Sequence, residues 1–260
     1  MKWFFAILFT LLGLLLVGFF YIPATVVPRA IAEVESRGLL PPRSPRLTLE
    51  QVSGTLWDGR AEKTSVEIDG ATIALGVLQW HLDKMSLWHR QPRLDLSTRS
   101  DKITLTGSVS ARETGEILVE NLEGHLPIAV LEPWFPQLVT GDIAFVVDHL
   151  LFTQQQLLSL DGLLNLEYVD WVGADNNMPL GSYIAKLGMA PNHDLLVDIN
   201  DLAARLGIDG HFRLNNSGNY RFDATLFPRE GLAPEVAQSI TWLGKIDRQG
   251  NVVIRQNGRL

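Results

Sequence analysis

The sequence predicts a mainly β protein, with one N-terminal transmembrane helix followed by a curved antiparallel β-sheet domain with one or two short helices. Three observations support this fold class: an uncharged segment from Trp3 to Ile22, alternation of apolar and polar residues near the C-terminus, and glycines recurring in β-rich segments. We expect a cytosolic tip and membrane anchor over 1–22, a Pro-rich linker over 23–45, and an exported β-rich domain over 46–260.

The uncharged segment is long enough to cross a bilayer, because each helical residue adds about 1.5 Å. Lys2 and the α-amino group precede it, so the positive-inside tendency favours a cytosolic N-terminus and an exported body. A cleaved signal peptide is the alternative, with 30–32 (AIA) as its cleavage site, but the apolar run is longer than a signal sequence requires. We therefore favour a retained anchor, represented by Trp3, Leu11, Leu16 and Ile22.

Composition excludes several classes of function. The chain has 22 basic and 29 acidic residues, for a net charge of −7, and no basic patch with interleaved aromatic residues. Nucleic acid is therefore not an expected partner. Cysteine is absent, which excludes disulfides, thiol catalysis and Cys-ligated zinc.

The linker combines turn-forming and helix-forming residues. Pro23 and Pro28 end the apolar helix, because proline cannot continue the hydrogen-bond ladder. The segment 29–37 can form a short helix, and 38–45 (GLLPPRSP) predicts a stiff, extended spacer.

The clearest strands lie near the C-terminus. Period-two alternation predicts strands over 208–214 and 220–226, and the intervening 215–219 (NNSGN) is typical of a hairpin turn. A helix is predicted over 234–243, with Val236, Ile240 and Leu243 on one stripe before Gly244. A turn or two of helix is predicted over 127–131, before Pro133 and Pro136. Further tight turns are predicted at Asp58-Gly59, Asp69-Gly70 and Gln249-Gly250.

Glycines recur at a regular interval within the β-rich segments. Gly107, Gly124 and Gly141 are seventeen residues apart, which suits a repeated strand-turn-strand unit. Glycine inside a strand marks a bulge, a bend or a close backbone approach. The repeat favours a long curved antiparallel sheet over a compact barrel, although any Gly-rich β protein can produce such matches.

No motif for catalysis or cofactor binding is present. None of the six histidines lies three or four residues from another, and the sequence lacks a nucleophile elbow, a phosphate loop and a dinucleotide-binding glycine motif. We expect no enzyme activity, no catalytic residue, no cofactor and no metal. The tryptophans beside turns favour core or sheet-edge positions, with a partner-binding role as the alternative for Trp57, Trp80 and Trp171.

Residues 52–61 (VSGTLWDGRA) resemble the opening motif G-T-[LVI]-W-x-G-x-A of the type II secretion system protein N family. The similarity continues at 78–82 (LQWHL), 139–145 (VTGDIAF) and 206–214 (LGIDGHFRL), and it extends over the C-terminal end of the chain. The spacer at 39–45 departs from the family pattern. The matched positions, which we interpret as strand and turn devices, are Gly54, Trp57, Gly59, Trp80, Gly210 and Gly244.

The resemblance implies a single-pass inner-membrane protein with its body in the periplasm of a Gram-negative bacterium. It further implies an accessory component that contacts other type II secretion system subunits while folded proteins leave the periplasm across the outer membrane. The alternative is an envelope lipid-binding β-groove protein, in which strands 208–214 and 220–226 line an apolar trough. An open trough favours lipid, whereas a trough capped by the helix at 234–243 does not. A periplasmic hydrolase is a third possibility without support from any motif.

Overall fold

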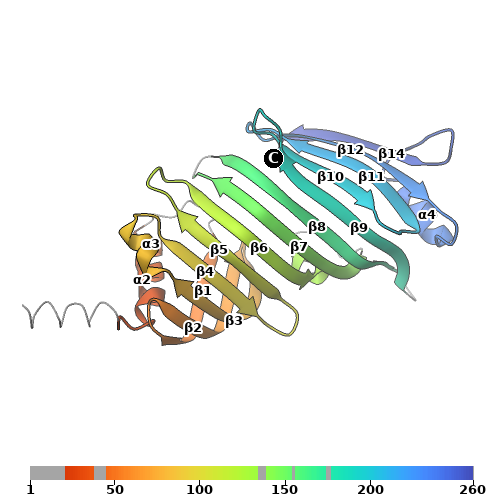
Figure 1. The fold of residues 1–260 in the computed structure, drawn as a ribbon. Helices are drawn as coiled ribbons and strands as arrows, with labels where there is room; N and C mark the ends of the chain where they lie inside the picture. Colours follow the sequence, from red (N-terminus) through yellow and green to blue (C-terminus); the bar gives the residue numbers. More distant parts are fainter. Residues whose placement is uncertain (1–20, 38–44, 134–138, 154–155, 174–176, 260) are drawn as a thin grey trace, which may run out of the picture. The chain divides into compact units, whose positions relative to one another are not determined.

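The computed structural model describes residues 21–37, 45–133, 139–153, 156–173 and 177–259. The chain divides into two compact units, Met1–Asp101 and Lys102–Leu260 (Figure 1). Of the predicted anchor residues, Trp3, Leu11 and Leu16 lie outside the described residues and Ile22 lies within them. In the described ranges, no helix has both the length and the apolar composition that crossing a membrane requires.

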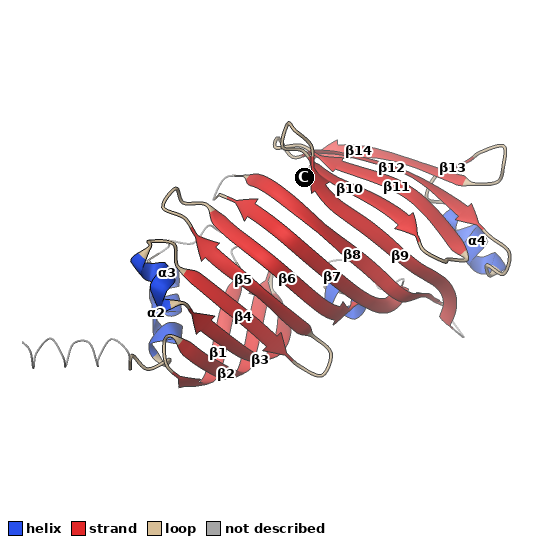
Figure 2. Ribbon diagram, in the orientation of Figure 1, coloured by secondary structure: helices blue, strands red, loops and turns tan. Residues whose placement is uncertain are grey.

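In its described residues, the first unit has an antiparallel sheet with the strand order β1-β2-β3-β4 and the helices α2 and α3 (Figure 2). Asp69 and Gly70 connect β2 to β3 with φ values of 48° and 82°, and Ile68 pairs with Ala71. Two successive positive φ values are typical of a type I′ hairpin, so the predicted turn is confirmed. The elements are α2 (Val26–Ser36), β1 (Arg46–Gly54), β2 (Asp58–Ile68), β3 (Ala71–Leu82), α3 (Lys84–Trp88) and β4 (Arg93–Arg99).

The second unit is also antiparallel, and its strand order is β5-β6-β7-β8-β9-β10-β11-β12-β14-β13. Up to β12 each strand pairs with the next one along the chain, which makes a meander. The elements are β5 (Thr104–Ala111), β6 (Ile117–Pro127), η1 (Ile128–Leu131), β7 (Val139–Phe152), β8 (Leu157–Val172), β9 (Asn177–Met189), β10 (Leu195–Asp201), β11 (Leu206–Leu214), β12 (Asn219–Pro228), α4 (Pro234–Ile240), β13 (Lys245–Ile246) and β14 (Val252–Arg259).

The predicted C-terminal hairpin is confirmed as β11 and β12. Leu214 pairs with Tyr220, and the Asn215 side-chain oxygen accepts hydrogen bonds from the backbone N–H groups of Ser217 and Asn219, both at 3.0 Å. This is the local bonding that makes asparagine a turn residue. Along β11 the apolar positions are more buried than the charged positions between them, as the alternation predicted.

Helix α4 covers part of the sheet in the second unit. Val236 and Ile240 are fully buried against Ala224, Leu226 and Val252 of the neighbouring strands. The predicted stripe is correct for Val236 and Ile240 and wrong for Leu243, because the helix ends at Ile240 and leaves Leu243 exposed.

The three regularly spaced glycines have different roles. Gly107 and Gly141 lie where the pairing register shifts between neighbouring strands, as expected of bulges. Gly124 instead keeps its register, and a Cβ atom there would lie 2.4 Å from the Phe145 ring and 2.5 Å from Leu105. This glycine therefore makes room for neighbouring side chains.

Candidate functional site

The segment that follows the predicted anchor is hydrogen-bonded to the turn between β1 and β2. The backbone N–H of Leu56 donates to the Ile22 carbonyl at 2.8 Å, and the N–H of Ala24 donates to the Gly54 carbonyl at 3.1 Å. Ala24 is fully buried. The position where the apolar segment ends is therefore attached to the sheet of the first unit by backbone bonds on both sides of Pro23.

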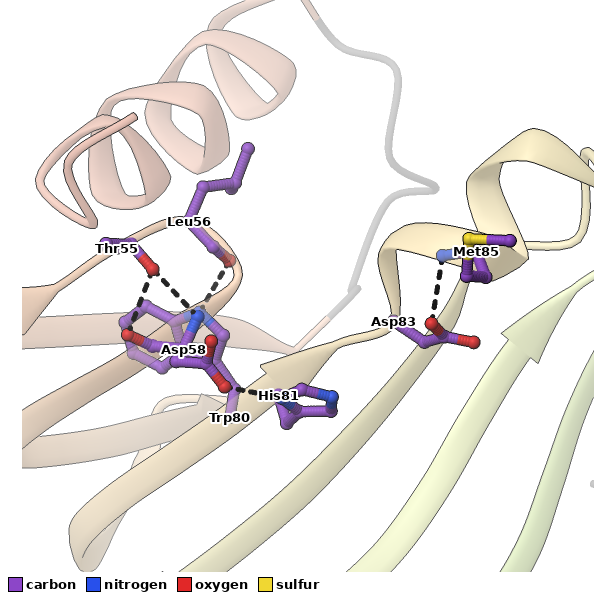
Figure 3. Close-up of polar contacts among 7 residues, drawn as sticks. All are labelled: Thr55, Leu56, Asp58, Trp80, His81, Asp83 and Met85. Atoms are coloured by element: carbon purple, nitrogen blue, oxygen red, sulfur yellow. Dashed lines mark hydrogen bonds and ion pairs between the residues drawn. The ribbon is translucent and has the colours of Figure 1, made fainter. Parts of the chain in front are cut away.

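Two tryptophans from the predicted motif stabilise this turn. Trp57 is 1% exposed, and its carbonyl accepts a hydrogen bond from the Leu82 N–H at 2.6 Å. Trp80 is 7% exposed, and its indole N–H donates to the Leu56 carbonyl at 3.1 Å (Figure 3). Both are therefore buried residues that join β3 to the turn, and neither presents an open ring face to a partner in this conformation.

The motif glycines around these tryptophans occupy positions where a side chain would not fit. A Cβ atom on Gly59 would lie 2.0 Å from the Trp80 ring, and Gly54 has a φ of +89° with the Asp58 carbonyl 2.4 Å from its Cβ position. Glycine at 59 therefore lets the indole lie flat against the backbone of β2, and glycine at 54 allows the chain to reverse.

The remaining motif positions and Trp171 lie in the second unit. Gly210 pairs with Ala224 in the hairpin. A Cβ atom at Gly210 would be in normal van der Waals contact with its neighbours, the nearest of which lies at 3.4 Å. Gly244 lies against β14, because a Cβ atom there would be 2.3 Å from the Val253 carbonyl oxygen. Trp171 is half-buried on β8 and packs against the core beneath α4. The motif residues and the candidate partner-binding tryptophans therefore lie partly in the first unit and partly in the second.

Helix α3 lies beside the β1–β2 turn and is held in place by polar bonds. The Asp83 side chain caps it by accepting from the Met85 N–H at 2.9 Å (Figure 3). The Ser86 hydroxyl donates to the Asp83 carbonyl at 2.5 Å and accepts from the Arg93 N–H at 2.9 Å. None of the side chains of α3 is buried.

Sequence reasoning did not predict α3. Five residues are too few to show a helical period. The only local signal was Asp83, because aspartate is favoured at the N-cap position before a helix. The consequence was that two exposed apolar residues of this helix, Met85 and Trp88, were not identified as a surface feature.

Histidine–aspartate pairs occur on exposed strand surfaces. His81 Nδ1 lies 2.5 Å from Asp58 Oδ1 (Figure 3), and His211 Nδ1 lies 2.7 Å from Asp198 Oδ1. The hydrogen bond to Asp198 raises the pKa of His211 above its usual value. All four side chains are more than half exposed, so these pairs lack the water-excluded setting that a catalytic base normally has. Over the described residues, no three His, Asp or Glu side chains are grouped to hold a metal ion.

Two arginine–aspartate pairs stabilise the second unit. Arg213 Nε lies 2.6 Å from Asp194 Oδ2, and this hydrogen bond holds the pKa of Asp194 below its usual value. Arg229 binds both carboxylate oxygens of Asp201, at 2.6 and 3.2 Å. Burial alone would raise the pKa of Asp201, but the bonds from Arg229 and backbone N–H groups outweigh it and the pKa is lowered.

A buried tyrosine lies beside the second of these pairs. The Tyr183 hydroxyl donates to the Leu206 carbonyl at 3.0 Å, and burial raises the pKa of Tyr183 to about 12. Both arginine–aspartate pairs and Tyr183 connect strands that are distant in sequence, which is a structural role.

A shallow pocket of about 360 Å³ lies over β5 to β8. Its lining combines polar residues, including His125 and Glu123, with the partly exposed apolar side chains of Val146 and Leu163. The side-chain oxygen of Asn165 in this lining is buried without a hydrogen-bond partner within the described part of the chain. The mixed polar and apolar lining is compatible with a small ligand.

One outer strand of the second unit keeps a free edge. β14 pairs with β12 over its whole length, whereas β13 pairs only with Val252 and Val253. From Ile254 to Arg259, the outer side of β14 has no strand partner among the residues that the structure describes. Such an edge can pair with an added strand.

These features define a β-sheet protein in which residues 22–24 are hydrogen-bonded to the first unit and the outer edge of β14 is open to an added strand. A sequence profile of the family described as "Type II secretion system (T2SS), protein N" matches residues 45–255. The chain therefore belongs to the type II secretion system protein N family.

Two relatives support this assignment. The chain is 28% identical to Type II secretion system protein N of Aeromonas hydrophila over 96% of this chain and 94% of the relative. It is 25% identical to Type II secretion system protein N of Klebsiella pneumoniae over 81% of this chain and 82% of the relative. No solved structure shows a significant match.

Proposed function

We propose that the protein is an accessory inner-membrane component of the type II secretion system. It supports the export of folded proteins from the periplasm across the outer membrane through contacts with other subunits of the system. The observation that carries the proposal is the family match across residues 45–255, which covers every strand of both units except the last residues of β14.

The attachment of residues 22–24 to the β1–β2 turn supports the inner-membrane part of the proposal. The uncharged segment 3–22 crosses the membrane, with the N-terminus cytosolic and the body periplasmic. Because Ile22 and Ala24 are bonded to the turn, no flexible linker separates the end of the anchor from the first unit. The first unit is thereby kept at the membrane surface.

The free edge of β14 supports the protein-contact part of the proposal. Strand addition to Ile254–Arg259 would satisfy backbone groups that otherwise bond to water, and it needs no prior rearrangement of the sheet. The exposed Trp242 lies in the segment just before β13 and offers apolar area for the same partner. Trp57 and Trp80 are buried, so we assign the contact with other subunits to the free edge of β14 and to Trp242 instead.

Lipid binding is the second candidate function, and one observation favours it. The pocket over β5–β8 exposes Val146 and Leu163, which pair across β7 and β8. In the predicted trough at 208–214 and 220–226, by contrast, Ile208 and Phe222 pack against the core that α4 covers. We therefore place the candidate lipid site at β5–β8.

A deletion and complementation experiment tests the proposal. In a strain lacking this gene, we expect folded exoproteins to accumulate in the periplasm and to return to the medium when the full chain is restored. A chain whose residues 1–22 are replaced by a cleavable signal sequence should restore secretion poorly, since it is exported but not anchored. Unchanged exoprotein secretion in the deletion strain would refute the proposal.

A separate measurement decides the lipid alternative. Purified, delipidated protein is mixed with labelled phospholipid vesicles and recovered, and bound phospholipid is counted. Val146→Asp and Leu163→Asp should abolish recovery if the β5–β8 pocket is the site, whereas Leu202→Asp, at an exposed residue outside the pocket, serves as the control. Absence of recovered phospholipid in the unmodified protein would remove this alternative.

A further inference from the structure

Helix α3 exposes apolar side chains, although hydrogen bonds hold its backbone in place. Met85 is 65% exposed and Trp88 is 86% exposed, and Leu87 between them is also exposed. A helix of five residues is normally stabilised by burial of an apolar face. No side chain of α3 is buried. Its capping and turn hydrogen bonds therefore hold these side chains out from the body.

The helix lies at the end of the first unit to which the anchor segment is bonded. β3 ends at Leu82, whose N–H donates to the Trp57 carbonyl, and α3 begins two residues later. Trp57 belongs to the same turn whose Leu56 binds Ile22. Lys84 at the start of α3 lies 5.6 Å from the centre of the Trp57 ring. Figure 3 shows this turn and α3 at the same end of the β strands.

Basic residues outnumber acidic residues around α3 in a chain that is acidic overall. Over 83–95, Lys84, Arg90 and Arg93 are basic and Asp83 and Asp95 are acidic, whereas the whole chain has a net charge of −7. Arg93 Nε lies 3.4 Å from Asp95 Oδ1, which leaves Lys84 and Arg90 as the basic residues assigned to the surface. Tryptophan prefers the interface between lipid headgroups and water, and basic residues are attracted to anionic headgroups. Tyr21, which is 74% exposed where the uncharged segment ends, has the same interfacial preference.

We propose that α3 is a membrane-surface contact, in which Trp88 and Met85 enter the headgroup region of the anionic bilayer that residues 3–22 cross. This inference rests on the proposed anchoring of the chain. The contact gives the first unit a second attachment beside the anchor, and it thereby limits the rotation of the body about the membrane normal.

The exposed apolar residues of the second unit do not share this setting. Trp242 is 87% exposed, and Leu243 and Ile246 near it are exposed as well. Their charged neighbours are Lys245, Asp247 and Arg248, so the difference from α3 lies in position: no bond in the described residues connects them to the anchor segment. Position 242 is therefore a matched control for position 88, with equal exposure and no expected lipid contact.

Fluorescence quenching in vesicles tests the proposal. The chain has no cysteine, so single cysteines at Trp88→Cys, Trp242→Cys and Leu11→Cys can each carry an environment-sensitive fluorophore in the full chain. The protein is reconstituted into vesicles of phosphatidylcholine with phosphatidylglycerol, or of phosphatidylcholine alone. Spin-labelled lipids with the quencher at a shallow or a deep position report the depth of each fluorophore.

The expected result separates this proposal from the anchoring proposal. Position 11 should be quenched by the deep label, position 88 by the shallow label, and position 242 by neither. Quenching at 11 without quenching at 88 would overturn the α3 contact and leave the anchor intact. Absence of quenching at 11 would refute the anchor itself. Equal quenching at 88 and 242 would also overturn the proposal, because the contact would not be specific to α3.

The charge contribution has its own test. Each basic residue near an anionic surface shifts the docking equilibrium about fivefold, so Lys84→Gln with Arg90→Gln should reduce quenching at 88 in the anionic vesicles. Quenching at 88 that is equal in both lipid mixtures would overturn the assignment to an anionic surface. A loss of secretion in Trp88→Ser, combined with no quenching at 88, would identify a protein partner instead and contradict the proposal.

Discussion

The substitution Gly59→Ala tests the packing of the motif turn most sharply. The added methyl carbon would lie 2.0 Å from the Trp80 ring, and the ring cannot move outward without losing the hydrogen bond from its indole N–H to the Leu56 carbonyl. Overpacking of this kind costs about 1–3 kcal/mol. The lost hydrogen bond adds about 1 kcal/mol, so we expect a total destabilisation of about 2–4 kcal/mol.

Urea unfolding of the full chain in detergent micelles, followed by tryptophan fluorescence, measures this cost. For an m-value of about 2 kcal/mol/M, the midpoint should fall by about 1–2 M. Gly188→Ala is the matched control, since Gly188 also lies in a strand but a Cβ atom there would meet nothing within 4 Å. Its midpoint should change little.

A double-mutant cycle then attributes the cost to the indole ring. In a Trp80→Leu background, Gly59→Ala should cost much less, because the smaller side chain leaves room for the methyl group. A Gly59→Ala chain as stable as the unmodified protein would refute the reasoning, and so would an equal cost in the two backgrounds.

Three further predictions concern the second unit. Ile240→Ala should destabilise it by about 2–5 kcal/mol through the cavity left under α4, measured by urea unfolding, whereas the exposed Gln238→Ala should not. The pKa of Asp194 is lowered from 3.8, so its pairing with Arg213 stabilises the fold above that pH and is lost as the pH falls through the lower folded pKa. Arg213→Gln should therefore reduce the acid sensitivity of the melting temperature, and an unchanged profile would contradict this. The pKa of His211 is raised, so the stability from its bond to Asp198 is present below pH 6.5 and is lost as the pH rises through the folded pKa. NMR titration should give a lower His211 pKa in Asp198→Asn than in the unmodified protein, and an unchanged pKa would contradict this.

The parts of the fold that could be predicted were those coded by local pattern. Alternation placed β11 and β12, and Asn215 identified their turn because its side chain bonds the next backbone N–H groups within the same five residues. The buried face of α4 followed from Val236 and Ile240 at helical spacing. These signals need no knowledge of distant residues.

The parts that could not be predicted depend on contacts between distant segments. Gly124 was expected to mark a bulge, a bend or a close backbone approach, but the Phe145 ring and the Leu105 side chain from the neighbouring strands decide its role. The attachment of Ile22 to Leu56 joins residues more than thirty positions apart, and sequence pattern carries no signal for such a bond. The exposed α3 was too short to show a period.

In-cell photo-crosslinking tests most directly whether the protein acts by contacting other secretion subunits. A photoreactive residue is placed at Trp242 and at Gln256 on the free edge of β14, with Glu67, an exposed residue of β2 in the first unit, as a control, and adducts are identified by mass spectrometry. We predict adducts to other type II secretion system subunits from positions 242 and 256 and none from position 67. Adducts to phospholipid alone from 242 and 256 would contradict the proposed function and favour a lipid-binding role.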